Sequence, residues 1–281
     1  MVNEAAHDPA SLELSPDAMR TMGHAVVERA VAHLAALDRA PSNGDFTGIE
    51  ALCRALREAA PEAGAPLDSL LDPLFEEWIP RSFGTPHPGY FAYIPGGGVY
   101  PAALADFIAD IANRYTGIWQ AAPALVQLEA NTLDWLRDWM QFPATARGLY
   151  TPGGSMAMFN AIAAAREDRL GHDIRAGTLY VSSQSHHSIT KAARLAGIAH
   201  DRVRTIAVDE NFRMRVDTLQ AAIAADRAAG LKPFMVFSTA GTTNTGAVDP
   251  LEAVADLCAR ENLWHHVDGA YGAFFHMVPE L

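Results

Sequence analysis

Asp268 ends an apolar run, and a threonine- and glycine-rich loop, 238–243, follows an earlier apolar run, 234–237. The segment between them, about Pro250 to Arg260, has helical periodicity, so the sequence predicts a strand, a crossover helix and a second, parallel strand. Ligands of open parallel sheets bind outside the carboxyl ends of the strands, so the loop and residues 268–271 are expected to flank one crevice. A carboxylate there can partner a cationic ligand atom; the alternatives are a helix cap or a loop salt bridge.

The run Gly148–Ser155, GLYTPGGS, precedes a helix that we expect to end near Leu170. Two glycines and a serine at a helix start leave backbone N–H groups free beside the positive end of the dipole, which suits a phosphate. Glycine and serine also begin ordinary helices, so the motif alone is a weak signal.

Histidines form a third group that could do chemistry. His186 lies in the run Ser183–Lys191, which leads from a short predicted strand, 178–182, into a helix. At such a place a histidine more often caps a loop than takes part in catalysis. The pairs His186–His187 and His265–His266 lack the spacing of zinc ligands, so no metal site is predicted.

Composition limits the functions open to the chain. Its 281 residues are 49% apolar and carry a formal net charge of −12, which argues against nucleic acid or an anionic membrane as partner. No apolar run reaches the roughly 18 residues of a membrane span, so we expect a cytoplasmic protein. Cys53 and Cys258 lie in helix-like contexts without a CxxC spacing, and buried free thiols in a reducing compartment are expected.

Helices must position these residues. Ser15-Pro16-Asp17 predicts the start of an amphipathic helix that runs to about Leu34, and this helix could pack on its own chain or on a second subunit. In a later helix, Trp135, Leu136 and Trp139 are expected in the core. The other expected elements are helices over about 49–59, 67–78, 101–115, 123–140 and 216–229, and a strand over 202–208.

Several separated motifs together resemble one family. The segment Ser238–Pro250, STAGTTNTGAVDP, followed by His266–Gly272, HVDGAYG, is similar to the paired signature of the pyridoxal-phosphate-dependent group II amino-acid decarboxylases, which include aromatic-amino-acid and glutamate decarboxylases. The resemblance runs from roughly Pro86 to the end of the sequence. It implies a fold-type I, aminotransferase-like α/β domain over residues 86–281, with a mostly parallel sheet flanked by helices. It also implies an N-terminal helical segment, 1–85, that interlocks across a homodimer.

The same resemblance implies a site for pyridoxal 5'-phosphate. Asp268 would hold a proton on the pyridine nitrogen, and Gly154 and Ser155 would bind the phosphate. His186 would lie flat against the cofactor ring and contact the substrate carboxylate. The two remaining cofactor contacts are Thr242, at the edge of the ring or at Asp268, and Ala270, which is small enough to let the ring lie close.

A loop over residues 83–98 is rich in proline, glycine and aromatic side chains, which suits the wall of a pocket. It resembles the family's substrate segment. The resemblance places Tyr93, Ile94, Pro95 and Gly96 beside an amino-acid substrate, and it favours an aromatic one. The alternative is a loop with a structural role alone.

The sequence contains two lysines, Lys191 and Lys232, and neither fits the lysine that forms a Schiff base with the cofactor. In the resembled family that lysine follows a histidine roughly thirty residues after the Asp-x-Ala-Tyr motif, which falls beyond Leu281. We therefore expect the N-terminal portion of a longer decarboxylase, its C-terminal part missing. The alternatives are a truncated, catalytically silent relative that acts as a binding or oligomerisation partner, and another pyridoxal-phosphate-dependent carbon–carbon lyase.

Overall fold

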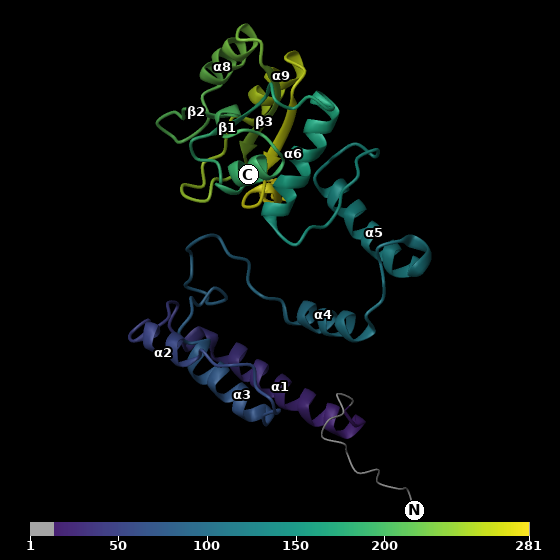
Figure 1. The fold of residues 1–281 in the computed structure, drawn as a ribbon, viewed down its shortest axis with the longest axis vertical. Coiled ribbons are helices and arrows are strands. Elements are labelled where there is room, and N and C mark those ends of the chain that lie inside the picture. Colours follow the sequence, from purple (N-terminus) through teal and green to yellow (C-terminus); the bar gives the residue numbers. More distant parts are fainter. Residues whose placement is uncertain (1–13, 281) are drawn as a thin grey trace, which may run out of the picture. The chain divides into compact units, whose positions relative to one another are not determined.

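The structure is a computed structural model, and it describes residues 14–280. The chain forms two compact units, one ending at Ile111 and the other beginning at Ala112 (Figure 1). The division expected after residue 85 stays a prediction.

The first unit is helical. Its helices are α1 (Pro16–Ala36), α2 (Ile49–Ala55), α3 (Leu67–Pro73) and α4 (Tyr100–Ala112). The predicted start of α1 is confirmed, because Ser15 Oγ accepts a hydrogen bond from the Ala18 N–H at 3.2 Å. The second helix is shorter than expected and ends four residues early.

The helix expected over residues 67–78 is present in two parts. After α3, residues Leu74–Trp78 form a π-helical turn, in which the Ile79 N–H donates to the Leu74 carbonyl. Pro73 lies directly before this turn and has no N–H to donate, which favours a break in the α-helical hydrogen bonding at this point.

The second unit is an α/β structure. Its strands form one parallel sheet in the order β2-β1-β3-β4, so the predicted parallel sheet is confirmed. The strands are β1 (Gly177–Ser182), β2 (Val203–Ile206), β3 (Lys232–Thr239) and β4 (Trp264–Asp268). The helices are α5 (Pro123–Trp139), α6 (Gly154–Leu170), α7 (Ser188–Leu195), α8 (Val216–Ala228) and α9 (Leu251–Arg260).

Helices cover both faces of the sheet. Successive side chains of a strand point to opposite sides, so apolar side chains of the same strand are buried on both faces. On one face, α6 and α7 pack with Leu179, Met235 and Phe237. On the other face, α8 and α9 pack with Tyr180 and Val236. A strand that is buried on both faces needs apolar residues at every position, which explains the uninterrupted apolar run in β3.

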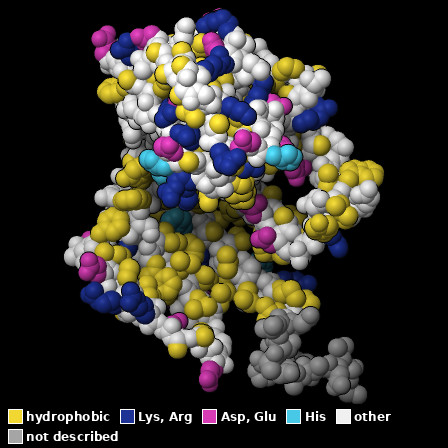
Figure 2. Space-filling view, turned by 45° about the horizontal axis from the view of Figure 1, so that its top comes forward, with side chains coloured by type: hydrophobic (Ala, Val, Ile, Leu, Met, Phe, Trp, Pro, Cys, Tyr) yellow, Lys and Arg dark blue, Asp and Glu magenta, His cyan; other side chains and the backbone are white. Residues whose placement is uncertain are grey.

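Two tryptophans of α5 lie on the surface. The core position expected for Trp135 and Trp139 is wrong, because their exposed fractions are 55% and 47%, while Leu136 is half-buried. The helical period predicts an apolar stripe but not what covers it. Hydrophobic side chains form broad yellow areas on the face of the molecule seen in the space-filling view (Figure 2).

Helix α1 contacts the α3 region through Arg29 and His33 and leaves apolar side chains exposed. None of its residues is buried, and Met19 and Val31 have exposed fractions of 54% and 45%. The expectation of two buried thiols is wrong for Cys53, which is exposed on α2, and correct for Cys258, which is buried on α9. Over residues 14–280, no helix combines the length and the hydropathy needed to cross a membrane.

Candidate functional site

Asp268 lies at the carboxyl end of β4 and has an exposed fraction of 7%. It pairs in register with Thr239, the last residue of β3, and the Ala240 N–H donates to the Asp268 carbonyl at 2.9 Å. In the side chain, Oδ1 accepts a hydrogen bond from the Ala270 N–H at 3.1 Å. The carboxylate is therefore fixed at the end of the strand, and its Oδ2 receives no hydrogen bond from the residues that the structure describes.

The loops after β3 and β4, which the sequence predicts to flank one crevice, lie against each other. Gly241 has a φ of +91°, and a Cβ there would lie 2.7 Å from Tyr271 Cδ1. A Cβ at Gly272 would lie 2.3 Å from the carbonyl oxygen of Ala240. Glycine is therefore needed at both positions, because it allows two loops to approach closely at the edge of the sheet that carries Asp268.

The first residues of α6 lie toward the same edge. This helix packs on β3 and β4, and a Cβ at Gly177, where β1 begins, would lie 2.3 Å from Cδ1 of Leu170, where α6 ends. The end of α6 therefore lies at the amino edge of the parallel sheet. Since its 17 residues span about 25 Å, Gly154 and Ser155 lie toward the carboxyl edge. Figure 1 shows α6 alongside the sheet.

The first turn of α6 presents free donors. No described side chain caps it, and the N–H groups of Gly154 and Ser155 have no acceptor within residues 14–280. Gly153 has φ 157° and ψ 171°, a region of backbone conformation that is essentially restricted to glycine. A Cβ at Gly153 or Gly154 would meet no described atom within 4 Å, so these glycines leave open space beside the donors.

His186 lies in the loop between β1 and α7 and is exposed. Its Nδ1 lies 2.7 Å from Ser188 Oγ, and its ring centroid lies 4.2 Å from that of His187. Because β1 neighbours β3 in a parallel sheet, this loop leaves the sheet at the carboxyl edge, where Asp268 also lies. The structure thus brings His186 to the expected edge of the sheet.

Thr242 and Ala270 lie in the two loops of this edge. Thr242 is buried, and its Oγ1 lies 2.6 Å from Thr245 Oγ1, so its hydroxyl already has a partner inside its own loop. Ala270 is exposed, directly after the turn that its N–H closes on Asp268. The contacts predicted for both residues with a ligand stay predictions.

Two further residues, without a role predicted from the sequence, lie at the end of β3 that pairs with Asp268. Thr239 has a buried Oγ1 without a hydrogen-bond partner among the described residues. Asp249, with an exposed fraction of 2%, accepts hydrogen bonds from the N–H groups of Thr239 at 2.8 Å and Met214 at 2.7 Å. Burial raises the pKa of Asp249, against the opposing effect of the two N–H donors.

The two histidines of β4 point to opposite faces of the sheet. The ring centroid of His266 lies 4.8 Å from that of Phe237, on the face covered by α6. His265 Nε2 lies 2.7 Å from Ser238 Oγ, on the other face. Burial lowers the pKa of both side chains, and the negative charge of Asp268 partly opposes this effect at His266. Both rings are therefore neutral at pH 7.

Comparison with known proteins identifies the family. Residues 50–281 match the pyridoxal-dependent decarboxylase conserved domain. The chain belongs to the pyridoxal-dependent decarboxylase family. The aromatic-L-amino-acid decarboxylase of Bacillus atrophaeus is 37% identical over 263 residues, which cover 94% of this chain and 55% of that protein. The enzyme of the same name from Bos taurus is 33% identical over 242 residues, which cover 79% of this chain and 49% of that protein.

Solved structures of family members share the fold. The crystal structure of Oryza sativa TDC with PLP and tryptamine superposes with a TM-score of 0.88 at 30% identity, over 96% of this chain and 58% of that one. Mouse CSAD superposes with a TM-score of 0.80 at 31% identity, over 92% and 57%. The chain therefore spans about half the length of the pyridoxal-dependent decarboxylases it matches, and the family, fold and cofactor predicted from its sequence are confirmed.

The carboxyl edge of the sheet fits the cofactor that gives the pyridoxal-dependent decarboxylases their name. A buried carboxylate with one oxygen free of described donors, at Asp268, suits a protonated ring nitrogen. Unpaired N–H donors beside open space, at Gly154 and Ser155, suit a phosphate. Both groups lie toward one edge of one sheet, as a single ligand requires.

The predicted substrate residues belong to the first unit. Tyr93 and Ile94 have φ values of 61° and 53°, so two consecutive residues other than glycine adopt a left-handed backbone. Such a conformation is costly, above all for a β-branched residue, and it concentrates at ligand-binding segments. The ring of Tyr93 lies 6.2 Å from that of Phe83, while Pro95 and Gly96 continue the loop without regular structure.

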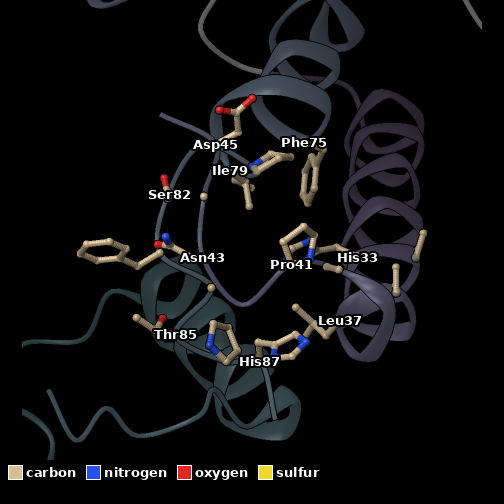
Figure 3. Close-up of a pocket in the computed structure, with 18 of the residues that line it drawn as sticks. His33, Leu37, Pro41, Asn43, Asp45, Phe75, Ile79, Ser82, Thr85 and His87 are labelled. Carbon is tan, nitrogen blue, oxygen red and sulfur yellow. The ribbon is translucent and has the colours of Figure 1, made fainter. Parts of the chain in front are cut away.

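A cavity of about 900 Å³ lies in the first unit, beside this loop (Figure 3). Phe83, which contacts Tyr93, is one of its lining residues, and His33 and Phe75 meet edge to face in its wall at a centroid distance of 5.9 Å. Its lining is mainly apolar, and Arg29 at its rim is paired with Asp72. The cavity has no predicted catalytic residue in its wall.

The two lysines lie on β3 and α7. Lys232 begins β3 and is exposed at the amino edge of the sheet, opposite to the edge of Asp268. Lys191 is exposed on α7. In this member of the pyridoxal-dependent decarboxylases, neither lysine is part of the candidate cofactor site formed by Asp268 and the first turn of α6.

Proposed function

We propose that this chain forms part of an enzyme that decarboxylates an L-amino acid, preferably an aromatic one, to the amine and carbon dioxide, using pyridoxal 5'-phosphate. One observation carries the proposal: a buried carboxylate, Asp268, ends β4 of a parallel sheet, toward the same edge as the uncapped first turn of α6. Family membership supports the reaction class. The aromatic preference is supported by the relatives named aromatic-L-amino-acid decarboxylase.

The reaction breaks the bond between Cα and the carboxylate, leaves its electron pair on Cα, and replaces the lost group with a proton. When bound, pyridoxal phosphate delocalises that electron pair into its ring, as long as the ring nitrogen stays protonated. Asp268 holds that proton by charge pairing, which its burial strengthens. Ala270 gives the ring room, because its side chain is a single methyl group.

The remaining roles follow the sequence-based assignments. Gly154 and Ser155 bind the phosphate through their free N–H groups. His186 stacks on the ring and orients the substrate carboxylate, with Nδ1 held by Ser188. Thr242 contacts the edge of the cofactor ring. Tyr93, Ile94, Pro95 and Gly96 border the substrate side chain, and the strained backbone at the first two favours a loop shaped for a ligand.

These residues do not include a lysine that could link the cofactor covalently. The lysine that links the cofactor covalently is contributed by a part of the protein outside this sequence, since Lys232 lies at the opposite edge of the sheet. We further propose a cytoplasmic homodimer. The dimer is supported by α1, which has no buried residue within residues 14–280 and exposes several apolar side chains.

The experiment uses the complete purified protein. We expect the visible absorbance of bound pyridoxal phosphate and release of carbon dioxide from an aromatic amino acid in a screen that also includes acidic ones. Asp268→Ala should abolish turnover while the phosphate contacts retain much of the cofactor, and Asp256→Ala, a change at an exposed position of α9, should leave turnover intact. Turnover by Asp268→Ala at the rate of the unchanged enzyme would reject the assigned role. Cofactor binding without decarboxylation of any amino acid would favour a catalytically silent relative.

A further inference from the structure

Thr239 carries a hydroxyl group that has no role in the function proposed above. The side chain of Thr239 is 4% exposed, and its Oγ1 is buried without a hydrogen-bond partner among residues 14–280. A buried hydroxyl without a partner costs about 1–3 kcal/mol, so native proteins rarely leave one unsatisfied. We therefore expect the Thr239 hydroxyl to have a hydrogen-bond acceptor that it does not contact in the structure as described.

Asp268 is the acceptor that the strand register places beside Thr239. Residues in register on neighbouring parallel strands point to the same face, and the register pairs Thr239 with Asp268 and Phe237 with His266. The rings of Phe237 and His266 are in contact on the face covered by α6, which fixes the direction of the next registered pair. Thr239 Oγ1 and the Asp268 carboxylate thus lie on one face, at adjacent strand ends.

The backbone of Thr239 is held firmly in this position. Its N–H donates to Asp249 Oδ2 at 2.8 Å, and its carbonyl accepts from the Asp249 N–H at 3.0 Å. A rotation about the Cα–Cβ bond redirects the hydroxyl and leaves these bonds intact. Asp268 offers Oδ2, since its described hydrogen bond uses Oδ1. A carboxylate oxygen has two lone pairs, so Oδ2 can accept from this hydroxyl and from the ring nitrogen together.

We propose that the Thr239 hydroxyl donates a hydrogen bond to the Asp268 carboxylate in the complete enzyme, and that Thr239 is a positioning residue for the cofactor's ring nitrogen. This inference rests on the proposed function. A hydrogen bond donated to a carboxylate favours its ionised form and fixes its direction. An ionised, fixed Asp268 keeps the proton on the ring nitrogen, so Thr239 acts on the cofactor through Asp268.

The neighbouring threonine is less suited to this role. Thr242 Oγ1 lies 2.6 Å from Thr245 Oγ1, and the Thr242 backbone closes its own loop through bonds to Ala247 and Gly246. The Thr242 hydroxyl already shares a hydrogen bond with Thr245, whereas that of Thr239 has no partner among the described residues. The contact to Asp268 that the sequence assigned to Thr242 is therefore better made by Thr239.

The test compares Thr239→Val, which keeps the shape and removes the hydroxyl, with Thr239→Ser, which keeps the hydroxyl. The complete enzyme is loaded with pyridoxal phosphate that is isotopically labelled at the ring nitrogen, and nitrogen NMR reports the protonation of that atom. For Thr239→Val we expect the resonance to move toward the unprotonated position, and kcat to fall about 10- to 100-fold with little change in KM. Thr239→Ser should restore both quantities.

The matched control is Thr205→Val, the same change at an exposed position of β2, on the far side of β1 from β3. It should leave the resonance and kcat unchanged. An unchanged resonance in Thr239→Val, with or without a loss of thermal stability, would overturn the inference. If instead the unchanged enzyme binds no cofactor, the proposed function itself fails, so the two failures are distinguishable.

Discussion

The Asp249 carboxylate holds the end of β3 by accepting the Thr239 N–H at 2.8 Å, while its other oxygen accepts the Met214 N–H at 2.7 Å. An amide in place of the carboxylate keeps one oxygen acceptor and turns an NH₂ group toward the second donor. We therefore expect Asp249→Asn to lower the free energy of unfolding by about 1–3 kcal/mol, measured by denaturant titration. Asp256→Asn, exposed on α9, should change it by less than about 0.5 kcal/mol. Equal effects of the two changes would show that the bridge contributes nothing.

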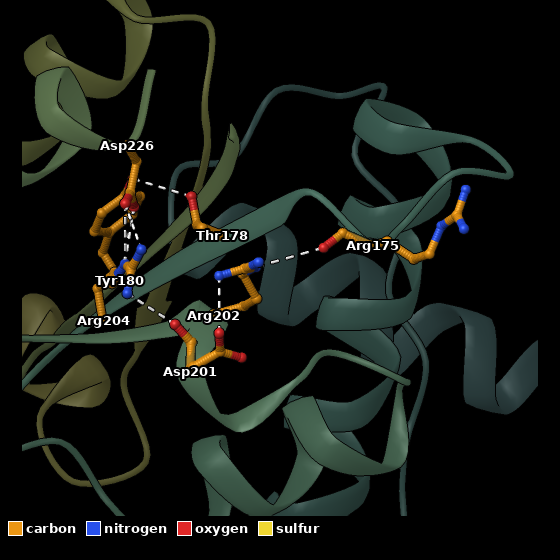
Figure 4. Close-up of polar contacts among 7 residues, drawn as sticks. All are labelled: Arg175, Thr178, Tyr180, Asp201, Arg202, Arg204 and Asp226. Atoms are coloured by element: carbon orange, nitrogen blue, oxygen red, sulfur yellow. Dashed lines mark hydrogen bonds and ion pairs between the residues drawn. The ribbon is translucent and has the colours of Figure 1, made fainter. Parts of the chain in front are cut away.

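Asp226 ties α8 to the sheet through a buried polar cluster (Figure 4). It accepts the Tyr180 hydroxyl at 2.8 Å and pairs with the Arg204 guanidinium at 2.5 Å. Burial pushes the pKa of Asp226 upward, but the bonds from Arg204 and Tyr180 outweigh this, and its pKa lies below the ordinary value. Asp226→Ala should therefore lower the free energy of unfolding by about 3 kcal/mol, because it leaves a buried donor, the Tyr180 hydroxyl, and a half-buried one, the Arg204 guanidinium, without their acceptor.

The matched control for Asp226 is Asp217→Ala, which breaks the pair between Arg215 and Asp217. Those two side chains are 51% and 65% exposed, so the control should cost less than about 1 kcal/mol. Because the pKa of Asp226 is lowered on folding, its contribution to stability is present near neutral pH and is lost as the pH falls below its ordinary value of 3.8. A loss that is the same at pH 7 and pH 3 would contradict this account.

His265 and His266 make stability depend on pH. Burial holds the pKa of each below the ordinary 6.5, so the unfolded chain binds more protons than the folded one as the pH falls below that value. The free energy of unfolding should therefore be constant above about pH 7 and decrease toward pH 5. Denaturant titrations at several pH values measure this slope. It should become smaller in His265→Gln and persist in His200→Gln, whose side chain is exposed.

The two cysteines should differ in reactivity. Burial raises the pKa of Cys258 to about 12, whereas Cys53 is exposed on α2. In the folded protein at pH 8, a thiol reagent should label Cys53 rapidly and label Cys258 at the rate of unfolding. Cys53→Ser should remove the fast phase, and Cys258→Ser should leave it unchanged. A single fast phase for both thiols would show that α9 opens readily.

Regular elements of the second unit could be predicted because their signals are local. The apolar runs that end at Ser182, Thr239 and Asp268 alternate with helical segments, and this order alone implies a parallel sheet. The position of Asp268 at the carboxyl edge followed from the topology. The resemblance of its motif to a known family then supplied a role that residue spacing could not.

Thr239 could not be predicted because its importance depends on register. In the run from Phe234 to Thr239 every residue is buried, so no alternation of polar and apolar residues shows which face each side chain takes. The pairing with Asp268 is a property of two strands, and the sequence of one does not contain it. The predicted burial of Trp135 and Trp139 was wrong for a related reason. A periodic apolar stripe identifies one face of a helix but not the element that covers this face.

Changes at Gly153 and Gly154 test separately how the first turn of α6 folds and whether it has the phosphate-binding role proposed for it. Gly153 has φ 157° and ψ 171°, so Gly153→Ala strains the backbone and should lower the free energy of unfolding by about 1–3 kcal/mol. Gly154 begins α6 and has open space around its Cβ position, so Gly154→Ala should leave the stability of the cofactor-free protein within about 0.5 kcal/mol. The added methyl group would occupy the space beside the free N–H donors, and the affinity for pyridoxal phosphate, measured by fluorescence titration, should fall about 10-fold. Unchanged affinity in Gly154→Ala, together with normal stability, would place the phosphate elsewhere.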